Sequence, residues 1–318
     1  MGSQKSICVS APCKVHLLGE HSVVYGKPAI LASVNLRVYV QISPTSLPLP
    51  PTNVQVTDKT QAVIEPIIKR HLQIKQLPPY NISINTEVPI GSGLGSSAAI
   101  SASYIAALLS FLKVKWDLNL VNNLAYNAEK VFHGNPSGAD NSTVTFGGLV
   151  WYRKETPDLK IIKKLDFSIP KKLAKNFILI NTGRPKETTK DMVVGVKKLY
   201  DQRPKLVNKF LEDQEKLVRE LLTVIKEGSE DNLIRIIRAG ERNLESIGVC
   251  STSVKKIIRK IEKSGGATKI CGAGSTVGPA GVLLCYHKDK SKIEKIAKAE
   301  NLDYFSAALG VDGLRKER

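Results

Sequence analysis

Apolar and polar positions along the chain recur with two different periods. Where every second residue is apolar, as at Leu36, Val38, Val40 and Ile42, a strand with one buried face is predicted. Where apolar residues recur every three to four positions, an amphipathic helix is predicted. In chain order the predicted strands are 7–11, 36–42, 82–84, 146–152, 177–180, 268–271, 282–286 and 304–309, and the predicted helices are 61–74, 96–112, 118–133, 189–202, 205–226, 231–246, 253–263 and 290–299.

The connections between these elements indicate how the chain is divided. The proline-rich stretch 44–52 is predicted to be a surface connection, and residues 134–148 a long polar loop. Strands and helices mix without strict alternation, which favours an α+β protein of two domains over a parallel α/β sheet. We expect the boundary in the polar linker 156–175, which gives domains 1–172 and 173–318.

Charge adds candidate partners that other features then remove. The 318 residues hold 47 Lys and Arg against 29 Asp and Glu, a net charge of +18. Such a balance suits nucleic acid, an acidic membrane or a phosphorylated small molecule. However, +14 of it lies after residue 150, where lysines alternate with acidic residues as on solvated helix faces. Aromatic residues make up only 6%, no nucleic-acid-binding motif occurs, and the most apolar window, 98–112, is too short to span a bilayer. Neither nucleic acid nor a membrane is therefore expected as a partner.

The cysteines indicate a compartment. There are five of them, an odd number, and no two have C-x-x-C spacing. Neither a disulfide framework nor a zinc site is predicted, so a reducing, cytoplasmic location is expected.

A glycine-rich segment, Gly91-Ser92-Gly93-Leu94-Gly95-Ser96-Ser97, opens the predicted helix 96–112. Glycines let backbone N–H groups turn toward an anion, and a helix N-terminus adds partial positive charge. The serine hydroxyls can bind phosphate or complete a Mg²⁺ shell. The segment matches neither the Walker A loop nor the dinucleotide fingerprint. It predicts a phosphate site, with a tight turn that caps a helix as the plainer alternative.

A second polar segment follows the first predicted strand. Lys14 lies between apolar neighbours, and Glu20 and His21 come a few residues later, directly after a glycine. Lys14 can stabilise phosphate charge or shift the pKa of a neighbouring group. Glu20 and His21 can bind hydroxyl or carboxylate groups of a ligand. Taken singly, Lys14 is better explained as a lysine whose head group reaches solvent, and His21 as a structural histidine.

A third segment offers two acidic residues. Glu129 is near the end of the predicted helix 118–133, offset from its apolar face, and Asp140 is in the glycine-containing loop that follows. One acid for a metal and another for a proton is what phosphoryl transfer to a hydroxyl requires. The alternatives are a solvated helix face for Glu129 and an Asx-turn for Asp140.

Together and in this order, the segments resemble the GHMP small-molecule kinases, and most closely the mevalonate kinase family. The resemblance rests on Gly19-Glu20-His21 followed by Val23-Val24-Tyr25-Gly26, on the block 133–141 (HGNPSGADN) and on 181–189 (NTGRPKETT), and it extends from about Ser10 to Leu284. It implies a two-domain GHMP kinase fold, with a ribosomal-S5-domain-2-like N-terminal half that binds ATP and Mg²⁺ and a ferredoxin-like C-terminal half.

The resemblance also implies an activity and the residues that perform it. The expected reaction is ATP-dependent phosphorylation of mevalonate at its 5-hydroxyl to give 5-phosphomevalonate and ADP, in the mevalonate route to isoprenoids. Asp140 takes or orients the hydroxyl proton, with Lys14 beside it. Glu20 and His21 orient mevalonate, and Thr188 lies near the transferred phosphoryl group.

The remaining implied roles concern ATP and the metal. Ser97 and Glu129 are expected to hold the Mg²⁺ that bridges the β- and γ-phosphates. The phosphates themselves are expected against Gly91, Ser92, Gly93, Leu94, Gly95, Ser96 and Ser97.

At one place the chain departs from the family pattern. The third family motif usually continues as a run of glycines after Gly-Ala-Gly, but here Ser275, Thr276 and Val277 follow Gly274. The resemblance therefore does not predict the shape of the acceptor pocket at this loop.

Other functions stay open at the sequence level. One is a sister GHMP enzyme, namely phosphomevalonate, homoserine or galactose kinase or diphosphomevalonate decarboxylase, and another is a basic nucleic-acid-binding protein. The oligomeric state is also open, a homodimer included.

Overall fold

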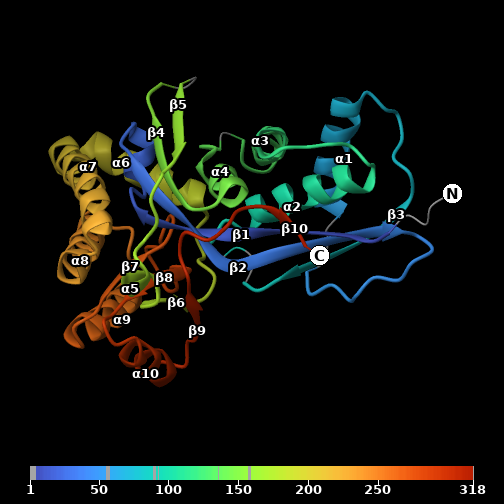
Figure 1. The fold of residues 1–318 in the computed structure, drawn as a ribbon. Coiled ribbons are helices and arrows are strands. Elements are labelled where there is room, and N and C mark those ends of the chain that lie inside the picture. Colours follow the sequence, from blue (N-terminus) through green and yellow to red (C-terminus); the bar gives the residue numbers. More distant parts are fainter. Residues whose placement is uncertain are drawn as a thin grey trace.

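Two antiparallel sheets organise the computed structural model, which describes residues 5–54, 58–88, 91, 93–134, 136–156 and 159–317 (Figure 1). The first sheet has the strand order β10-β1-β2-β4-β5, with β3 also paired to β2, and the second has the order β7-β8-β6-β9. The strands of the first sheet are β1 (Ile7–Leu18), β2 (Ala29–Pro44), β3 (Tyr80–Thr86), β4 (Leu149–Lys154), β5 (Lys160–Lys164) and β10 (Arg315–Lys316). Those of the second are β6 (Phe177–Asn181), β7 (Ala267–Ile270), β8 (Val282–Tyr286) and β9 (Asp303–Ala307).

Helices cover each sheet. Four of them lie on one face of the first sheet (Figure 1): α1 (Asp58–Leu72), α2 (Ser96–Phe111), α3 (Leu118–His133) and α4 (Ala139–Phe146). Those of the C-terminal part are α5 (Lys171–Ala174), α6 (Thr189–Gln202), α7 (Pro204–Glu227), α8 (Glu230–Ser246), α9 (Thr252–Lys263) and α10 (Ser291–Ala299). No helix in the described part of the chain is both long and apolar enough to cross a bilayer.

Helix α2 is the element that brings the glycine-rich segment to the first sheet. It is buried along almost its whole length and packs on β1 and β2. Its alanines and serines are small enough for the helix to approach the sheet closely, and the buried Ser103 hydroxyl is satisfied by donating to the Ala99 carbonyl at 2.6 Å. The C-terminal end of the glycine-rich segment is therefore anchored by a buried helix.

Two predicted connections were wrong. The expected loop 134–148 contains α4, which begins after Gly138, a residue with a φ of +89°. Its many polar residues leave no clear amphipathic pattern that would predict a helix. Val144 and Thr143 are nevertheless fully buried, so tertiary packing stabilises the helix. The expected linker 156–175 contains β5 and α5. The lysines of β5 suit an edge strand, because their charge discourages pairing with another chain.

Strand β1 runs seven residues beyond its predicted end. Pro12 made an end at residue 11 reasonable, since proline cannot donate to a neighbouring strand. In the structure the register with β2 shifts between Pro12 and Cys13, and pairing then continues to Leu18. This extension carries Lys14 and His16.

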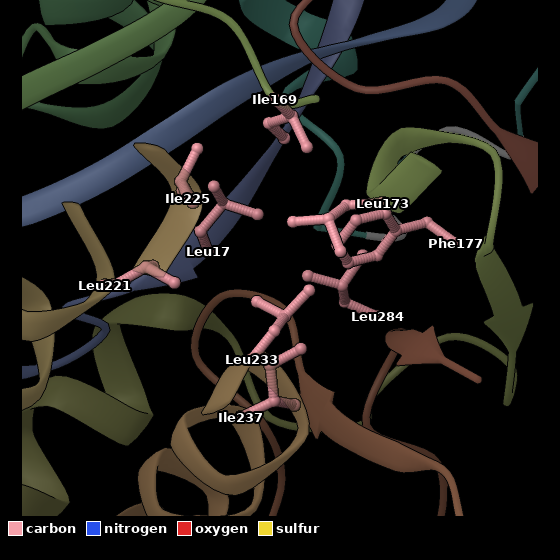
Figure 2. Close-up of a pocket in the computed structure, with 9 residues that line it drawn as sticks. All are labelled: Leu17, Ile169, Leu173, Phe177, Leu221, Ile225, Leu233, Ile237 and Leu284. Carbon is pink, nitrogen blue, oxygen red and sulfur yellow. The ribbon is translucent and has the colours of Figure 1, made fainter. Parts of the chain in front are cut away.

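The predicted boundary between residues 172 and 173 lies in the connection between the two sheets, and the division into two domains stays a prediction. The chain after β9 returns to the first sheet, where β10 pairs with β1 through Val9 and Lys316. Apolar side chains from both sheets join one core cluster. A cavity of about 10 Å³ in this core has only apolar side chains around it (Figure 2), so it is a packing void. It is lined by Leu17, Ile169, Leu173, Phe177, Leu221, Ile225, Leu233, Ile237 and Leu284.

Candidate active site

Strand β1 and helix α4 bring the two predicted catalytic residues together. Lys14 and His16 are two positions apart on β1, so they project to the same face of the sheet. Lys14 Nζ lies 3.2 Å from Asp140 Oδ1, and His16 Nε2 lies 3.8 Å from the same oxygen. The side chain of Lys14 is 5% exposed, whereas that of Asp140 is 37% exposed. A carboxylate that touches a buried ammonium and keeps accessible surface can meet a substrate.

Asp140 stands in the first turn of α4, not in the Asx-turn that was the alternative. Burial alone would raise the pKa of this carboxyl, but the Lys14 charge and the neighbouring His16 outweigh burial and hold the pKa well below its usual range. The partial positive charge of a helix N-terminus also favours the carboxylate. Asp140 is therefore ionised at neutral pH.

Glu129 lies on α3 and is 4% exposed, so the alternative of a solvated helix face was wrong. Burial, and then the negative charge of Asp140, raise the pKa of Glu129 to about 7, against the opposing effects of Lys14 and of hydrogen bonds from Ser97 and Ser101. Ser97 is in the first turn of α2. The structure thus brings together the two residues expected to hold Mg²⁺.

The glycine-rich segment is fixed to β1 and to Lys14. The backbone N–H of Lys14 donates to the Leu94 carbonyl at 2.8 Å. Gly95 has a φ of +69°, and a Cβ atom there would lie 2.8 Å from Lys14 Cγ, so only glycine lets the loop approach the lysine this closely. On the other side of the loop, a Cβ on Gly93 would lie 2.9 Å from the Cys271 carbonyl oxygen. Gly91 and Ser96 are described as well, whereas Ser92 lies outside the described residues.

The Gly19-Glu20-His21 turn after β1 contacts the loop 271–281 between β7 and β8, which we call the C-terminal glycine loop. Glu20 forms an ion pair with Lys269 of β7, and the two side chains are 1% and 0% exposed. His21 has a φ of +59°, unusual for a residue with a side chain, and its Nε2–H donates to the Ala273 carbonyl at 2.9 Å. Burial lowers the pKa of His21, so its imidazole is neutral at pH 7. Both residues expected to orient the substrate therefore also contact the third family motif.

Thr188 has a structural role at the start of α6. It is the N-cap of α6, where its hydroxyl accepts from the Asp191 N–H at 3.2 Å and donates to the Asp191 carboxylate at 2.7 Å. Within the described chain, the hydrogen bonds of its hydroxyl are to Asp191 and not to Lys14, Asp140 or the glycine-rich segment.

Sequence reasoning missed two residues of this region. The predicted strand 7–11 ended before His16. Had it been continued to Leu18, its period of two would have placed His16 on the same face as Lys14. Lys269 is fully buried in β7, and a lysine in a short apolar strand before a glycine loop was the available signal.

The fold and this arrangement of residues define a class of protein. Residues 59–148 match the family described as the GHMP kinases N terminal domain. The chain is 31% identical over 268 residues to mevalonate kinase of Archaeoglobus fulgidus, which covers 83% of this chain and 88% of that relative. It is 28% identical to human mevalonate kinase, over 87% of this chain and 85% of the human protein. The chain belongs to the mevalonate kinase family of the GHMP kinases.

Solved structures share the fold. The crystal structure of L. major mevalonate kinase in complex with R-mevalonate superposes with a TM-score of 0.80 at 21% identity, over 95% of each chain. Methanococcus jannaschii mevalonate kinase also gives 0.80, at 23% identity over 97% of this chain and 99% of that one. The GHMP kinase fold and the family expected from the motifs are thus confirmed.

Proposed function

We propose that this protein is an ATP-dependent kinase that phosphorylates mevalonate at its 5-hydroxyl, giving 5-phosphomevalonate and ADP. Family membership supports the activity. The observation that carries the proposed mechanism is the Lys14–Asp140 pair, which lies against a glycine-rich segment at the N-terminus of a buried helix. This is the combination of a proton acceptor, a cation and a phosphate loop that transfer to an alcohol needs.

In the proposed step, Asp140 accepts a hydrogen bond from the 5-hydroxyl of mevalonate. This hydrogen bond orients the hydroxyl oxygen toward the γ-phosphorus of ATP. The new O–P bond forms, the proton passes to Asp140, and the bond to the bridging oxygen breaks so that ADP leaves with the electron pair. Because the pKa of Asp140 is low, the carboxylate is a weak base, and its main contribution is orientation, with proton transfer late in the step. Lys14 stabilises the negative charge that develops on the transferred group.

Ser97 and Glu129 fit a Mg²⁺ ion. A hydroxyl and a carboxylate are hard oxygen donors of the kind that this ion prefers. The carboxylate is buried beside a second negative charge, which raises its pKa to about 7 and which a cation would relieve. When bound, the ion supplies positive charge to the β- and γ-phosphates of ATP. The phosphates are proposed to lie against the backbone of 91–96.

The polar acceptor is proposed to lie between β1 and the C-terminal glycine loop. Three buried atoms there have no hydrogen-bond partner within the described chain: His16 Nδ1, Glu20 Oε2 and His21 Nδ1. Buried polar atoms are costly unless they are paired. A small acceptor with carboxylate and hydroxyl groups, such as mevalonate, offers the hydrogen bonds that they lack.

A reducing, cytoplasmic compartment is proposed for the protein. All five cysteines are free thiols in the structure, and four of them are buried.

The function is tested by measuring ADP release from purified protein with ATP, Mg²⁺ and a panel of acceptors. Mevalonate should give turnover, and phosphomevalonate, homoserine and galactose should give little. Turnover with another acceptor and none with mevalonate would refute mevalonate as the substrate. The protein would then be a GHMP kinase that acts on a different acceptor. Withdrawal of Mg²⁺ by a chelator should abolish the activity, and its return should restore it.

A further inference from the structure

Two loops of the C-terminal part are hydrogen-bonded to each other at both ends. One loop, residues 182–188, follows β6, and the other, residues 275–281, precedes β8. At their base the Thr182 N–H donates to the Gly281 carbonyl at 2.9 Å, and the Gly281 N–H donates to the Gly183 carbonyl at 3.1 Å. At their far end Glu187 of the first loop accepts hydrogen bonds from Ser275 and Thr276 of the second.

The Glu187 carboxylate is fully engaged at this contact. Its Oε2 accepts from Ser275 Oγ at 2.6 Å, and its Oε1 accepts from the Thr276 N–H at 3.0 Å and from the Thr276 hydroxyl. Ser275 is fully buried, whereas Thr276 and its hydrogen bonds to Glu187 are exposed, so only the Ser275 side of the contact is shielded from water. We refer to Glu187, Ser275 and Thr276 as the clamp.

Two members of the clamp, Ser275 and Thr276, stand where the family's third motif usually has glycines. Glycines at both positions would leave Glu187 with one donor of three, the backbone N–H of residue 276. The side chains that depart from the family pattern therefore have a partner in this chain, the glutamate at 187.

The clamp fixes a loop that runs past the glycine-rich segment. Arg184 belongs to this loop, and its Nε lies 3.9 Å from the point where a Cβ on Gly91 would stand. The loop ends at Thr188, which caps α6. Gly183 is held against Pro279, which lies 3.3 Å from a Cβ built on the glycine. A shift at Glu187 would therefore move the segment that faces the proposed phosphate site.

We propose that Glu187 is a positioning residue: through Ser275 and Thr276 it holds loop 182–188 at a fixed place beside the nucleotide phosphates. This inference rests on the proposed function, since the phosphates are those of the ATP assigned there. Holding groups in place before the reaction lowers the entropic cost of the transition state, so loss of the clamp reduces turnover and nucleotide use.

Hydrogen bonding, not charge pairing, makes the contact. The Ser275 and Thr276 hydroxyls, which favour the ionised carboxylate, lower the pKa of Glu187 to about 2, so the contact is intact across neutral pH. A glutamine at position 187 can therefore replace the glutamate in this contact. The glutamine oxygen accepts from Thr276, and its NH₂ group donates to Ser275 Oγ. The single Ser275 hydroxyl proton, for which Glu187 and the Val277 carbonyl both lie within reach in the wild type, is then donated to the Val277 carbonyl alone, 2.7 Å away.

The test compares Glu187→Ala, Glu187→Gln, the double variant S275G/T276G and the triple variant that combines S275G/T276G with Glu187→Ala. Glu187→Ala should lower kcat/KM for ATP by about tenfold, with an unchanged melting temperature and a smaller change in KM for mevalonate. Glu187→Gln should stay within about twofold of wild type. S275G/T276G should lose about as much as Glu187→Ala, and the triple variant should lose no more. Glu212→Ala, at an exposed glutamate on α7, is the control.

Hydrogen exchange gives a readout independent of turnover. Peptides that cover 182–188 and 275–281 should exchange faster in Glu187→Ala than in wild type, and at the wild-type rate in Glu187→Gln. Wild-type kinetics in Glu187→Ala, or losses that add fully in the triple variant, would overturn the proposal. If the wild type does not phosphorylate mevalonate, the proposed function fails and exchange alone decides: unchanged exchange overturns the clamp, and faster exchange supports it.

Discussion

Asp140 and Glu129 are both carboxylates of one site, and their surroundings drive their pKa values apart. Lys14 and His16 outweigh the effect of burial at Asp140 and lower its pKa, whereas burial and the charge of Asp140 raise the pKa of Glu129 to about 7. Such a separation is how one site assigns different tasks to chemically similar groups. It supports a substrate-facing role for Asp140 and a cation-binding role for Glu129.

Replacing Asp140 by asparagine tests the first of these roles. The amide keeps the shape of the side chain but cannot take a proton, and it leaves the buried Lys14 without its negative partner. We expect kcat to fall by about 10²- to 10⁴-fold, with ATP affinity changed by much less. Steady-state ADP release and titration calorimetry with ATP measure the two quantities. Asp213→Asn, at the exposed Lys209 ion pair on α7, is the matched control and should behave as wild type. Near-normal kcat in Asp140→Asn would contradict the assignment.

At the scale of single residues, the sequence predicted the site residues that belong to the family motifs. Lys14, Glu129 and Asp140 were predicted, because the resemblance names them and the structure then brings them into one site. Glu187 was quoted only as a letter of a motif, since its partners are about 90 residues away and no local pattern predicts a hydrogen bond across that separation.

Elements with strong periodicity and clear caps were predicted almost to the residue. The predicted ranges of α3 and α6 match the structure, because Asp117 and Thr188 mark their first turns and an apolar face runs through each helix. Helix α4 was missed, since asparagine, serine and threonine are weak helix formers and its stability comes from burial. Strand β10 has only two residues, too few to show a period.

Helix α8 carries a fully buried acid, Glu241, whose Oε2 accepts from the Ile270 N–H of β7 at 3.0 Å. Burial raises the pKa of Glu241 to about 7 from a usual value of 4.5. Between these two values the folded chain holds the proton that the unfolded chain has lost. The free energy of unfolding therefore decreases as pH rises through this window, and the loss is complete above pH 7.

Glu241→Gln should remove this pH dependence, because the amide oxygen still accepts from Ile270 and nothing ionises. Its free energy of unfolding relative to wild type should rise by roughly 2–3 kcal/mol between pH 5 and pH 8. Urea unfolding at the two pH values measures the change. Glu212→Gln, at an exposed position on the neighbouring helix, should show the same difference from wild type at both. An equal effect of Glu241→Gln at both pH values would show that Glu241 is ionised in the folded protein.

On the scale of the whole molecule, one buried ion pair connects the two sheets. Lys269 of β7 pairs with Glu20, in the turn after β1, and also donates to the Ile270 carbonyl at 2.7 Å. Burial works against the ammonium charge, but Glu20 and neighbouring groups raise the pKa of Lys269 overall. Lys269 is therefore charged in the folded protein at neutral pH, and loss of its ion pair should weaken the contact between the two sheets.

Lys269→Met should lower the free energy of unfolding by about 3–5 kcal/mol, because it leaves Glu20 buried without a cation. The double variant E20L/K269M should recover a large part of the loss, since no buried charge remains. Denaturant unfolding of the three proteins measures these differences. Lys288→Met, at an exposed lysine paired with Asp231, is the control and should leave stability unchanged. Wild-type stability in Lys269→Met would mean that the pair contributes nothing.

The pairing of β10 with β1 has a consequence for synthesis on the ribosome. Val9 leaves the exit tunnel early, but its partner Lys316 is made about 300 residues later. During that interval the edge of β1 has its backbone groups unpaired, and the first sheet has its full set of strands only when residues 315–316 emerge. The first sheet of this enzyme therefore cannot be completed before the C-terminal part has been translated, even though the proposed catalytic residues Lys14 and Asp140 are translated well before that part.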